Sequence, residues 1–176
     1  MRVIEPSSWR AQRWKNGKGI THEVWRTPEG DGADDYDVRV SVAELTTDGP
    51  FSRFPGYRRW SFLVGTAPIE LTYDQRASRE PAVSLVAPGD HVQLPGDVAV
   101  TAHLRAGSTH LLNIFARVPL VAGYGPIGHP VRLVFALAPR PELDARTAVA
   151  RWAALLHETP IVTDTTDCIW IADSSG

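Results

Sequence analysis

A glycine-rich segment at residues 14–23 gathers residue types that are scarce elsewhere in the chain. It holds Asn16, one of two asparagines, and Lys15 and Lys18, the only lysines. A Walker phosphate loop is excluded because such a loop needs Ser or Thr directly after its lysine, and Gly19 follows Lys18. Two interpretations remain open: a turn that leads into a strand, or a loop that presents Asn16 to a ligand.

Residues 37–44 alternate between valine and other residues, with the period of a β-strand. The valines share one face of this strand, and Arg39 and Ser41 share the other. If the valines face a core between two sheets, Arg39 and Ser41 face solvent. If the strand lines a small barrel, Arg39 is instead a buried cation that needs an anionic partner, either a side chain or a ligand. A guanidinium grips a carboxylate through two parallel hydrogen bonds.

Residues 48–59 have the glycine and proline spacing of a loop. Phe51 and Phe54 are too apolar to lie in water without a reason, and Ser52 stands between them. The two aromatic rings either anchor the loop to the protein or stack on a ligand.

The sequence gives no sign of a metal centre or of a nucleophile. No His-x-His or His-Glu-x-x-His pair occurs, although metal sites commonly place close ligand pairs on one element. We therefore expect no metal and no other cofactor. Gly-x-Ser-x-Gly is absent, and the single cysteine, Cys168, lies in an apolar strand where an inert thiol is expected. No catalytic residue is identified. The histidines are His22, His91, His103, His110, His129 and His157.

Period-two patterning predicts that strands position these residues. A hairpin turn is expected at residues 65–68. Val149, Trp152, Ala153 and Leu156 have helical spacing instead, which predicts one helix over residues 145–157. Short strands with at most one substantial helix indicate an all-β barrel or sandwich. The expected strands cover residues 21–26, 35–45, 60–64, 69–73, 82–87, 98–104, 109–118, 131–138 and 168–172.

The composition limits the partners and the setting of the chain. Its 176 residues fit one domain, and 14 Gly with 14 Pro favour many short strands. A formal charge of −2 with dispersed arginines argues against nucleic acid as a partner. No apolar run approaches the ~20 residues of a membrane span. Residues 1–14 lack the pattern of a secretion signal, and one cysteine allows no intrachain disulfide, so we expect a cytoplasmic protein.

Taken in order, three segments resemble the HutD/Ves family. Residues 14–23 resemble its Trp-x-Asn-Gly-Gly-Gly-x-Thr-x-Glu signature, residues 37–44 its Arg-x-Ser-x-Ala strand, and residues 48–58 its Asp-Gly-Pro-Phe-Ser-x-Phe-Pro-Gly loop. Residues 95–97 and the strand around Asn113 also look like the family. The departures are Lys18, where a third glycine is usual, and Leu111, where an aspartate is expected.

The resemblance implies a double-stranded β-helix of the cupin type, also called an RmlC-like jelly roll, built as a bicupin. The whole chain, residues 1–176, would form a single HutD-like bicupin domain. Residues 1–118 carry the family motifs, and residues 119–176 would complete a degenerate second half. Typical cupins bind a metal through a His-x-His, Glu and His set, which this sequence lacks, so the metal is not carried over.

The association of some family members with histidine utilisation suggests carboxylate ligands such as urocanate or formylglutamate. We expect a small polar or anionic metabolite as the partner, with Arg39 receiving its anionic end and Asp97 orienting Arg39 or accepting from a ligand donor. The predicted ligand-binding residues are Asn16, Arg39, Ser41, Ser52, Phe54, Asp97 and Asn113.

The leading hypothesis is a non-catalytic binding protein that modulates histidine utilisation. The alternative is a metal-independent isomerase or hydrolase of a small acid that uses Glu23, Asp97 or a histidine as acid or base. In a third interpretation the cavity is vestigial and the function lies with a protein partner. Pairing of sheet edges would allow a homodimer. The sequence identifies neither the ligand nor a regulatory target.

Overall fold

The computed structural model describes residues 2–14, 17, 19–30, 35–73, 82–137, 154–163 and 167–174. The chain divides into two compact units. We call Arg10–Arg117 the core unit, and Met1–Trp9 together with Val118–Gly176 the terminal unit. Each unit is described by itself.

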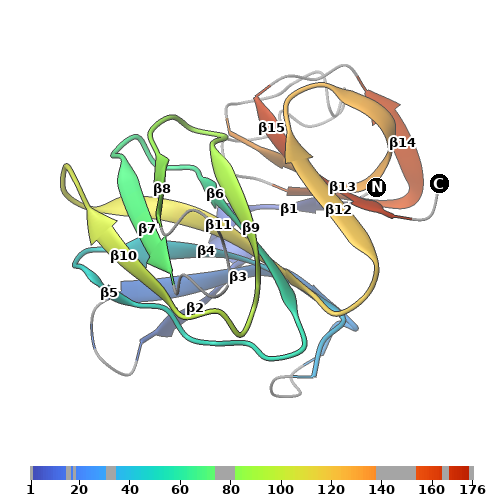
Figure 1. Ribbon diagram of the computed structural model, residues 1–176. Coiled ribbons are helices and arrows are strands. Elements are labelled where there is room, and N and C mark those ends of the chain that lie inside the picture. Colours follow the sequence, from blue (N-terminus) through green and yellow to red (C-terminus); the bar gives the residue numbers. More distant parts are fainter. Residues whose placement is uncertain are drawn as a thin grey trace. The chain divides into compact units, whose positions relative to one another are not determined.

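The core unit contains two antiparallel sheets (Figure 1). One has six strands in the order β2-β3-β4-β11-β6-β9, and the other has four strands in the order β5-β10-β7-β8. The six-stranded sheet is built from β2 (Arg10–Arg13), β3 (Gly19–Thr27), β4 (Val38–Leu45), β11 (Thr109–Ala116), β6 (Arg58–Leu63) and β9 (His91–Pro95). The four-stranded sheet is built from β5 (Gly49–Pro50), β10 (Val100–Leu104), β7 (Ile69–Tyr73) and β8 (Ala82–Leu85).

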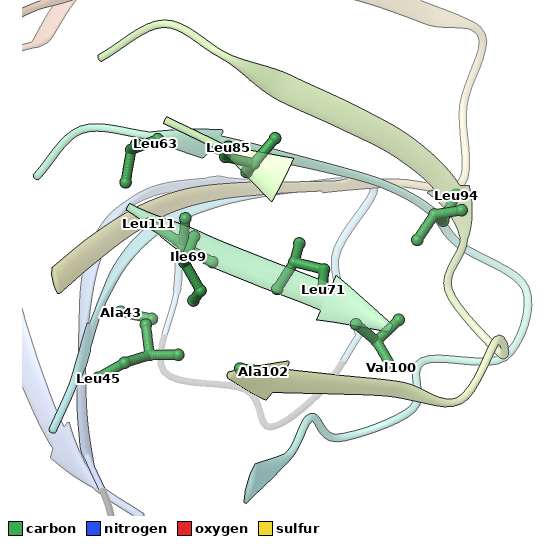
Figure 2. Packing of buried hydrophobic residues seen from close by; sticks show 10 residues of the cluster. All are labelled: Ala43, Leu45, Leu63, Ile69, Leu71, Leu85, Leu94, Val100, Ala102 and Leu111. Carbon is green, nitrogen blue, oxygen red and sulfur yellow. The ribbon is translucent and has the colours of Figure 1, made fainter. Parts of the chain in front are cut away.

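A hydrophobic cluster fills the space between these two sheets (Figure 2). Its members alternate along each strand because successive side chains point to opposite faces of a sheet. Both sheets contribute, so the core unit is a β-sandwich. The cluster consists of Ala43, Leu45, Leu63, Ile69, Leu71, Leu85, Leu94, Val100, Ala102 and Leu111.

This packing decides between the two orientations of β4. Ala43 and Leu45 point into the sandwich, so Arg39 and Ser41, which share their face, point inward as well. The three valines of β4 lie on the opposite face and are also buried. The prediction that Arg39 and Ser41 point inward is therefore correct, and the solvent-facing interpretation is wrong.

The stretch at residues 65–68 connects the two sheets and is not a hairpin. β6 pairs with β11 and β9, whereas β7 pairs with β10 and β8. The expected hairpin is wrong because the alternating patterns of two consecutive strands do not say whether the strands pair. Gly65 passes against Thr109, where an added Cβ would lie 2.6 Å from the hydroxyl oxygen.

The terminal unit joins both ends of the chain in one antiparallel sheet of order β1-β14-β13-β15-β12. A 3-10 turn, Pro6–Ser8, follows β1. The buried residues of one of its clusters are Val131, Val134, Ala136, Cys168 and Ala172. The strands are β1 (Arg2–Ile4), β12 (Leu120–Tyr124), β13 (Ile127–Ala136), β14 (Ala154–Thr163) and β15 (Cys168–Asp173).

The prediction of an all-β, cupin-like fold is confirmed. The end of the predicted helix is wrong, because residues 154–157 belong to β14, which pairs with β1 and β13. The earlier part of that helix, residues 145–153, lies outside the described residues. Within the described residues, no helix has the length and apolar character needed to cross a membrane.

Candidate functional site

The core unit contains a cavity of about 450 Å³ beside its hydrophobic cluster. Strands of the six-stranded sheet and the loop after β5 form its walls. The lining residues are Gln12, Arg13, Trp14, Thr21, Arg39, Ser41, Ala43, Pro50, Phe51, Ser52, Phe54, Arg59, Asn113 and Phe115.

Strand register places the polar lining in two rows across β4, β11 and β6. Asn113 stands opposite Ser41 on one side and Ser61 on the other. Two positions further along β11, Phe115 stands opposite Arg39 and Arg59. Because residues two apart share a face, both rows point into the sandwich together with Ala43. The rows are Ser41, Asn113, Ser61 and Arg39, Phe115, Arg59.

Arg59 is the buried cation of this site, with 7% of its surface exposed. Its Nη2 donates to Asn113 Oδ1 at 2.7 Å, and its Nε lies 3.0 Å from Ser61 Oγ and 3.2 Å from Asn113 Oδ1. The guanidinium carbon lies 4.3 Å from the ring centroid of Phe51 and 5.4 Å from that of Phe115. These contacts orient the charged group without neutralising it.

Burial lowers the pKa of the Arg59 guanidinium to about 9. Loss of hydration is the cause, since burial in a medium of low polarity disfavours a charged group. Among the described residues, no carboxylate lies within ion-pair distance of Arg59. At neutral pH this part of the cavity therefore holds a positive charge whose contacts, among the described residues, are with neutral groups and aromatic faces.

Arg39, the other inward arginine of the row, already has an anionic partner. Its Nε lies 2.9 Å from Glu23 Oε2, while Arg26 Nε lies 3.1 Å from Glu23 Oε1. The Glu23 carboxylate thus bridges two guanidinium groups. Arg59, and not Arg39, is therefore the cation that has no anionic partner among the described residues.

The loop after β5 closes the cavity with aromatic side chains. Phe51 packs under Arg59, and the ring of Phe54 lies 4.3 Å from the ring of Phe115, measured between centroids. The Phe51 amide donates to the Val100 carbonyl at 2.9 Å, and the Phe54 amide donates to the Gly96 carbonyl at 2.7 Å. These rings are therefore both loop anchors and part of the cavity wall.

Five of the seven predicted site residues line the cavity: Arg39, Ser41, Ser52, Phe54 and Asn113. Asp97 does not, because it is exposed in the turn after β9, and Glu23 takes the place expected for it beside Arg39. Asn16 lies outside the described residues.

Sequence reasoning missed Arg59, the most informative residue of the cavity. A signal for it existed. Arg59-Trp60-Ser61 repeats the Arg-x-Ser pattern of Arg39-Val40-Ser41, and the two strands that carry these patterns flank β11 on either side.

The described lining residues of the cavity form no acidic or nucleophilic cluster of the kind that binds metals. No group of three or more His, Cys, Asp or Glu that could hold a metal ion occurs in the part of the chain that the structure describes. The described lining residues offer guanidinium, amide, hydroxyl and aromatic groups, which suit recognition of an anion.

Comparison with known proteins agrees with this architecture. The HutD family model matches residues 6–125. The chain belongs to the HutD family. Its relatives include the uncharacterized 21.2 kDa protein in the hutC 3'region of Pseudomonas putida, which is 28% identical over 114 residues, or 65% of this chain. The protein Ves of Escherichia fergusonii is 38% identical over 58 residues, or 33% of this chain.

The solved structure of HutD from Pseudomonas fluorescens SBW25 (formate condition) superposes with a TM-score of 0.71 at 22% identity, and covers 97% of this chain and 96% of that one. At this identity the likeness shows that the HutD fold is shared. The sequence matches to the curated relatives span 57% of the P. putida protein and 29% of Ves.

Proposed function

We propose that the core unit binds a small organic anion, with a carboxylate of the ligand seated on Arg59. The observation that carries this proposal is a buried guanidinium whose described partners are an amide, a hydroxyl and two aromatic rings. A buried charge without a counter-ion is costly, and a carboxylate that pairs with it removes much of that cost. The guanidinium fork suits a carboxylate because it can donate two parallel hydrogen bonds.

The rest of the cavity supports a ligand with an anionic head and a flat or apolar body. Its volume of about 450 Å³ falls within the range of small-molecule sites. Phe51, Phe54 and Phe115 provide apolar surface, while Ser41 and Ser52 provide hydroxyl groups. The charge of Arg39 is partly compensated, because Arg39 shares the Glu23 carboxylate with Arg26.

Binding without turnover is the better-supported role. The described lining residues include no Asp, Glu, His, Lys or Cys, the side chains that most often transfer protons in catalysis. The position of the P. putida relative in the hutC 3'region makes acids of histidine breakdown the first candidates, so a cytoplasmic role in modulating histidine utilisation is part of the proposal.

A ligand screen tests this function. Thermal shift and calorimetry would compare formate, urocanate and formylglutamate with matched neutral amides, and NMR would follow each binder for turnover. Formate is included because a structure of the P. fluorescens HutD carries the designation formate condition. We expect carboxylates to bind, their amides not to bind, and the Arg59→Met variant to bind carboxylates roughly tenfold more weakly or worse. If the protein binds amides and acids equally, the proposed anion site is wrong. If NMR shows turnover of a bound acid, the protein is an enzyme and not a binding protein.

A further inference from the structure

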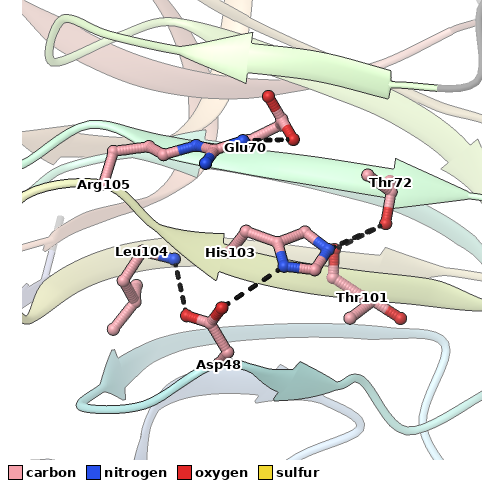
Figure 3. Close-up of polar contacts among 7 residues, drawn as sticks. All are labelled: Asp48, Glu70, Thr72, Thr101, His103, Leu104 and Arg105. Atoms are coloured by element: carbon pink, nitrogen blue, oxygen red, sulfur yellow. Dashed lines mark hydrogen bonds and ion pairs between the residues drawn. The ribbon is translucent and has the colours of Figure 1, made fainter.

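A second polar network lies on the four-stranded sheet, on the face opposite the hydrophobic cluster (Figure 3). The His103 imidazole stands between two partners. Its Nδ1 lies 3.3 Å from Asp48 Oδ2, and its Nε2 lies 3.2 Å from Thr72 Oγ1. The other carboxylate oxygen of Asp48 accepts a hydrogen bond from the Leu104 amide at 2.9 Å. Asp48 therefore holds the start of β5 against β10 through the Leu104 amide and the His103 side chain.

This segment leads directly into the cavity. Asp48 precedes β5, whose Gly49 and Pro50 pair with Ala102 and Thr101 of β10. We call residues 48–54 the cavity loop, because Pro50, Phe51, Ser52 and Phe54 all line the cavity. Asp48 is thus the first side-chain anchor of the loop that forms one cavity wall.

Among the described residues, four ionisable groups face one another in this network, and they come from every strand beside β10. Asp48 precedes β5, Glu70 lies on β7 opposite His103, and Arg105 follows β10. Arg105 Nη2 lies 2.6 Å from Glu70 Oε1. Two carboxylates and one guanidinium leave a net charge of about −1 with a neutral imidazole, so a protonated His103 balances the network.

The carboxylate of Asp48 stays ionised over the range in which histidines titrate. Its pKa lies below the usual value, first because the Leu104 amide donates to it and then because of His103 and Arg105. Asp48 is therefore the fixed anion of this pair, and the imidazole is the partner that can accept a proton.

We propose that His103 and Asp48 form a proton-dependent latch on the cavity loop. Protonation of the imidazole converts its contact with Asp48 into an ion pair, which holds the loop more firmly against β10. The latch itself is independent of any ligand. Its effect on ligand affinity rests on the proposed function, since the held loop carries part of the cavity wall.

The His103 ring can stay in one place in both protonation states, because each state has hydrogen-bond partners there. In the neutral form Nδ1–H donates to Asp48, and Nε2 accepts from the Thr72 hydroxyl. In the protonated form Nε2–H donates to Thr72 Oγ1, and the Thr72 hydroxyl can turn to the Thr101 carbonyl, 3.5 Å away. The latch therefore changes strength without a movement of the ring.

Amide hydrogen exchange measures the latch without a ligand. The amides of Phe51 and Phe54 report on the loop, because they donate to the carbonyls of Val100 and Gly96. After correction for intrinsic exchange, their protection should be about two- to fivefold higher at about pH 5.5 than at about pH 8, the range expected for a partly exposed ion pair. The His103→Gln variant should show no such rise. A rise of the same size in that variant would overturn the latch.

Two further variants separate charge from folding defects. Asp48→Asn keeps an oxygen for the Leu104 amide but loses the charge, so its loop should match wild type at the higher pH and lack the rise at the lower pH. His91→Gln removes a histidine that stacks on Phe62 and lies outside the network, and it should keep the rise. A rise that survives in Asp48→Asn, or disappears in His91→Gln, would contradict the proposal.

Formate calorimetry at the two pH values then tests the coupling. Tighter formate binding at the lower pH in wild type but not in His103→Gln supports it. If amide exchange in the loop depends on pH but formate affinity does not, the coupling is wrong and the latch still stands. If no carboxylate binds at any pH, the proposed function fails, while the exchange result still decides the latch.

Discussion

The Asn113 amide oxygen accepts hydrogen bonds from Arg59 Nη2 at 2.7 Å and from the Ser61 hydroxyl at 2.8 Å. Arg59 Nε lies 3.2 Å from the same oxygen. The amide fixes the plane of the guanidinium but carries no negative charge, so the arginine is held in place while its charge stays uncompensated. The Arg59 guanidinium is therefore preorganised to bind an anion, because its orientation is already fixed before the ligand arrives.

Replacement of Arg59 by methionine should separate binding from stability. Methionine fills a similar volume without the charge, so carboxylate affinity should fall by roughly 10-fold or more, since a charge-assisted bond contributes about 1.5–3 kcal/mol. The free protein should be as stable as wild type, or more stable by about 1–4 kcal/mol, because an uncompensated buried cation is removed. Calorimetry and urea unfolding measure the two effects.

Arg59→Lys serves as the partner variant. It keeps the charge but loses the two-donor fork, so it should recover only part of the carboxylate affinity. Full affinity in Arg59→Met, with an intact fold, would eliminate Arg59 as the anion partner.

Alkaline pH should weaken ligand binding before an ordinary arginine titrates. The pKa of Arg59 is lowered to about 9 by burial, so in the His103→Gln variant, which lacks the latch, carboxylate affinity should be level below this pH and fall above it by about tenfold per pH unit. The stability of the free protein should change in the opposite sense. Above about pH 9, and below the pKa of an ordinary arginine, the unfolded chain binds the proton and the folded chain does not, so stability rises with pH. Subtracting the pH profile of Arg59→Met isolates this contribution.

Strand alternation predicted which residues share a face but not which face points inward. On β4 both faces are buried, since Val40 is fully inaccessible and Ser41 is 1% exposed. The physical cause is that each face of this central strand packs against protein, so residue polarity alone does not distinguish them. The family resemblance placed the Phe51 to Phe54 loop and the Asn113 strand at one site, and both line the cavity.

The sequence did not predict the complete site, because strand pairing determines which residues point into the cavity. Arg59 follows Arg58, and only the register of β6 against β11 places Arg59 inward beside Asn113. The helix expected near Leu156 failed for a related reason. Local spacing favoured a helix, but pairing of Leu156 with Arg2 and Leu133 places it in a strand, and tertiary pairing overrides a weak local preference.

Glu23→Gln should remove the anionic partner of Arg39 and so increase the positive charge at the cavity wall. The variant keeps a polar side chain but lacks the negative charge that Arg39 and Arg26 share, so carboxylate affinity should rise by about two- to fivefold at low salt. The fold should lose about 1–2 kcal/mol, because a partly buried ion-pair network is broken. Calorimetry at two salt concentrations and urea unfolding test these effects. Unchanged affinity at low salt would mean that Arg39 does not act on the ligand.

Gly96→Ala should disrupt the cavity by displacing the turn that carries Phe54. A Cβ at position 96 would collide with the Phe54 carbonyl oxygen and lie 2.9 Å from the Tyr57 carbonyl oxygen, both backbone atoms that do not yield easily. Because the Phe54 amide also donates to the Gly96 carbonyl, the collision should shift the Phe54 ring away from Phe115. We expect a loss of about 1–3 kcal/mol in stability together with weakened carboxylate binding.

The matched control for this variant is Gly107→Ala. Gly107 has a φ of +90° in the turn after β10, with open space around its Cα, so alanine there strains the backbone without touching the cavity. It should lower stability by about 1 kcal/mol and leave carboxylate affinity unchanged. If both alanine variants weaken binding in proportion to their loss of stability, the Gly96 contact acts only through the fold. A selective loss in Gly96→Ala would identify the contact between Gly96 and Phe54 as the support of the cavity wall.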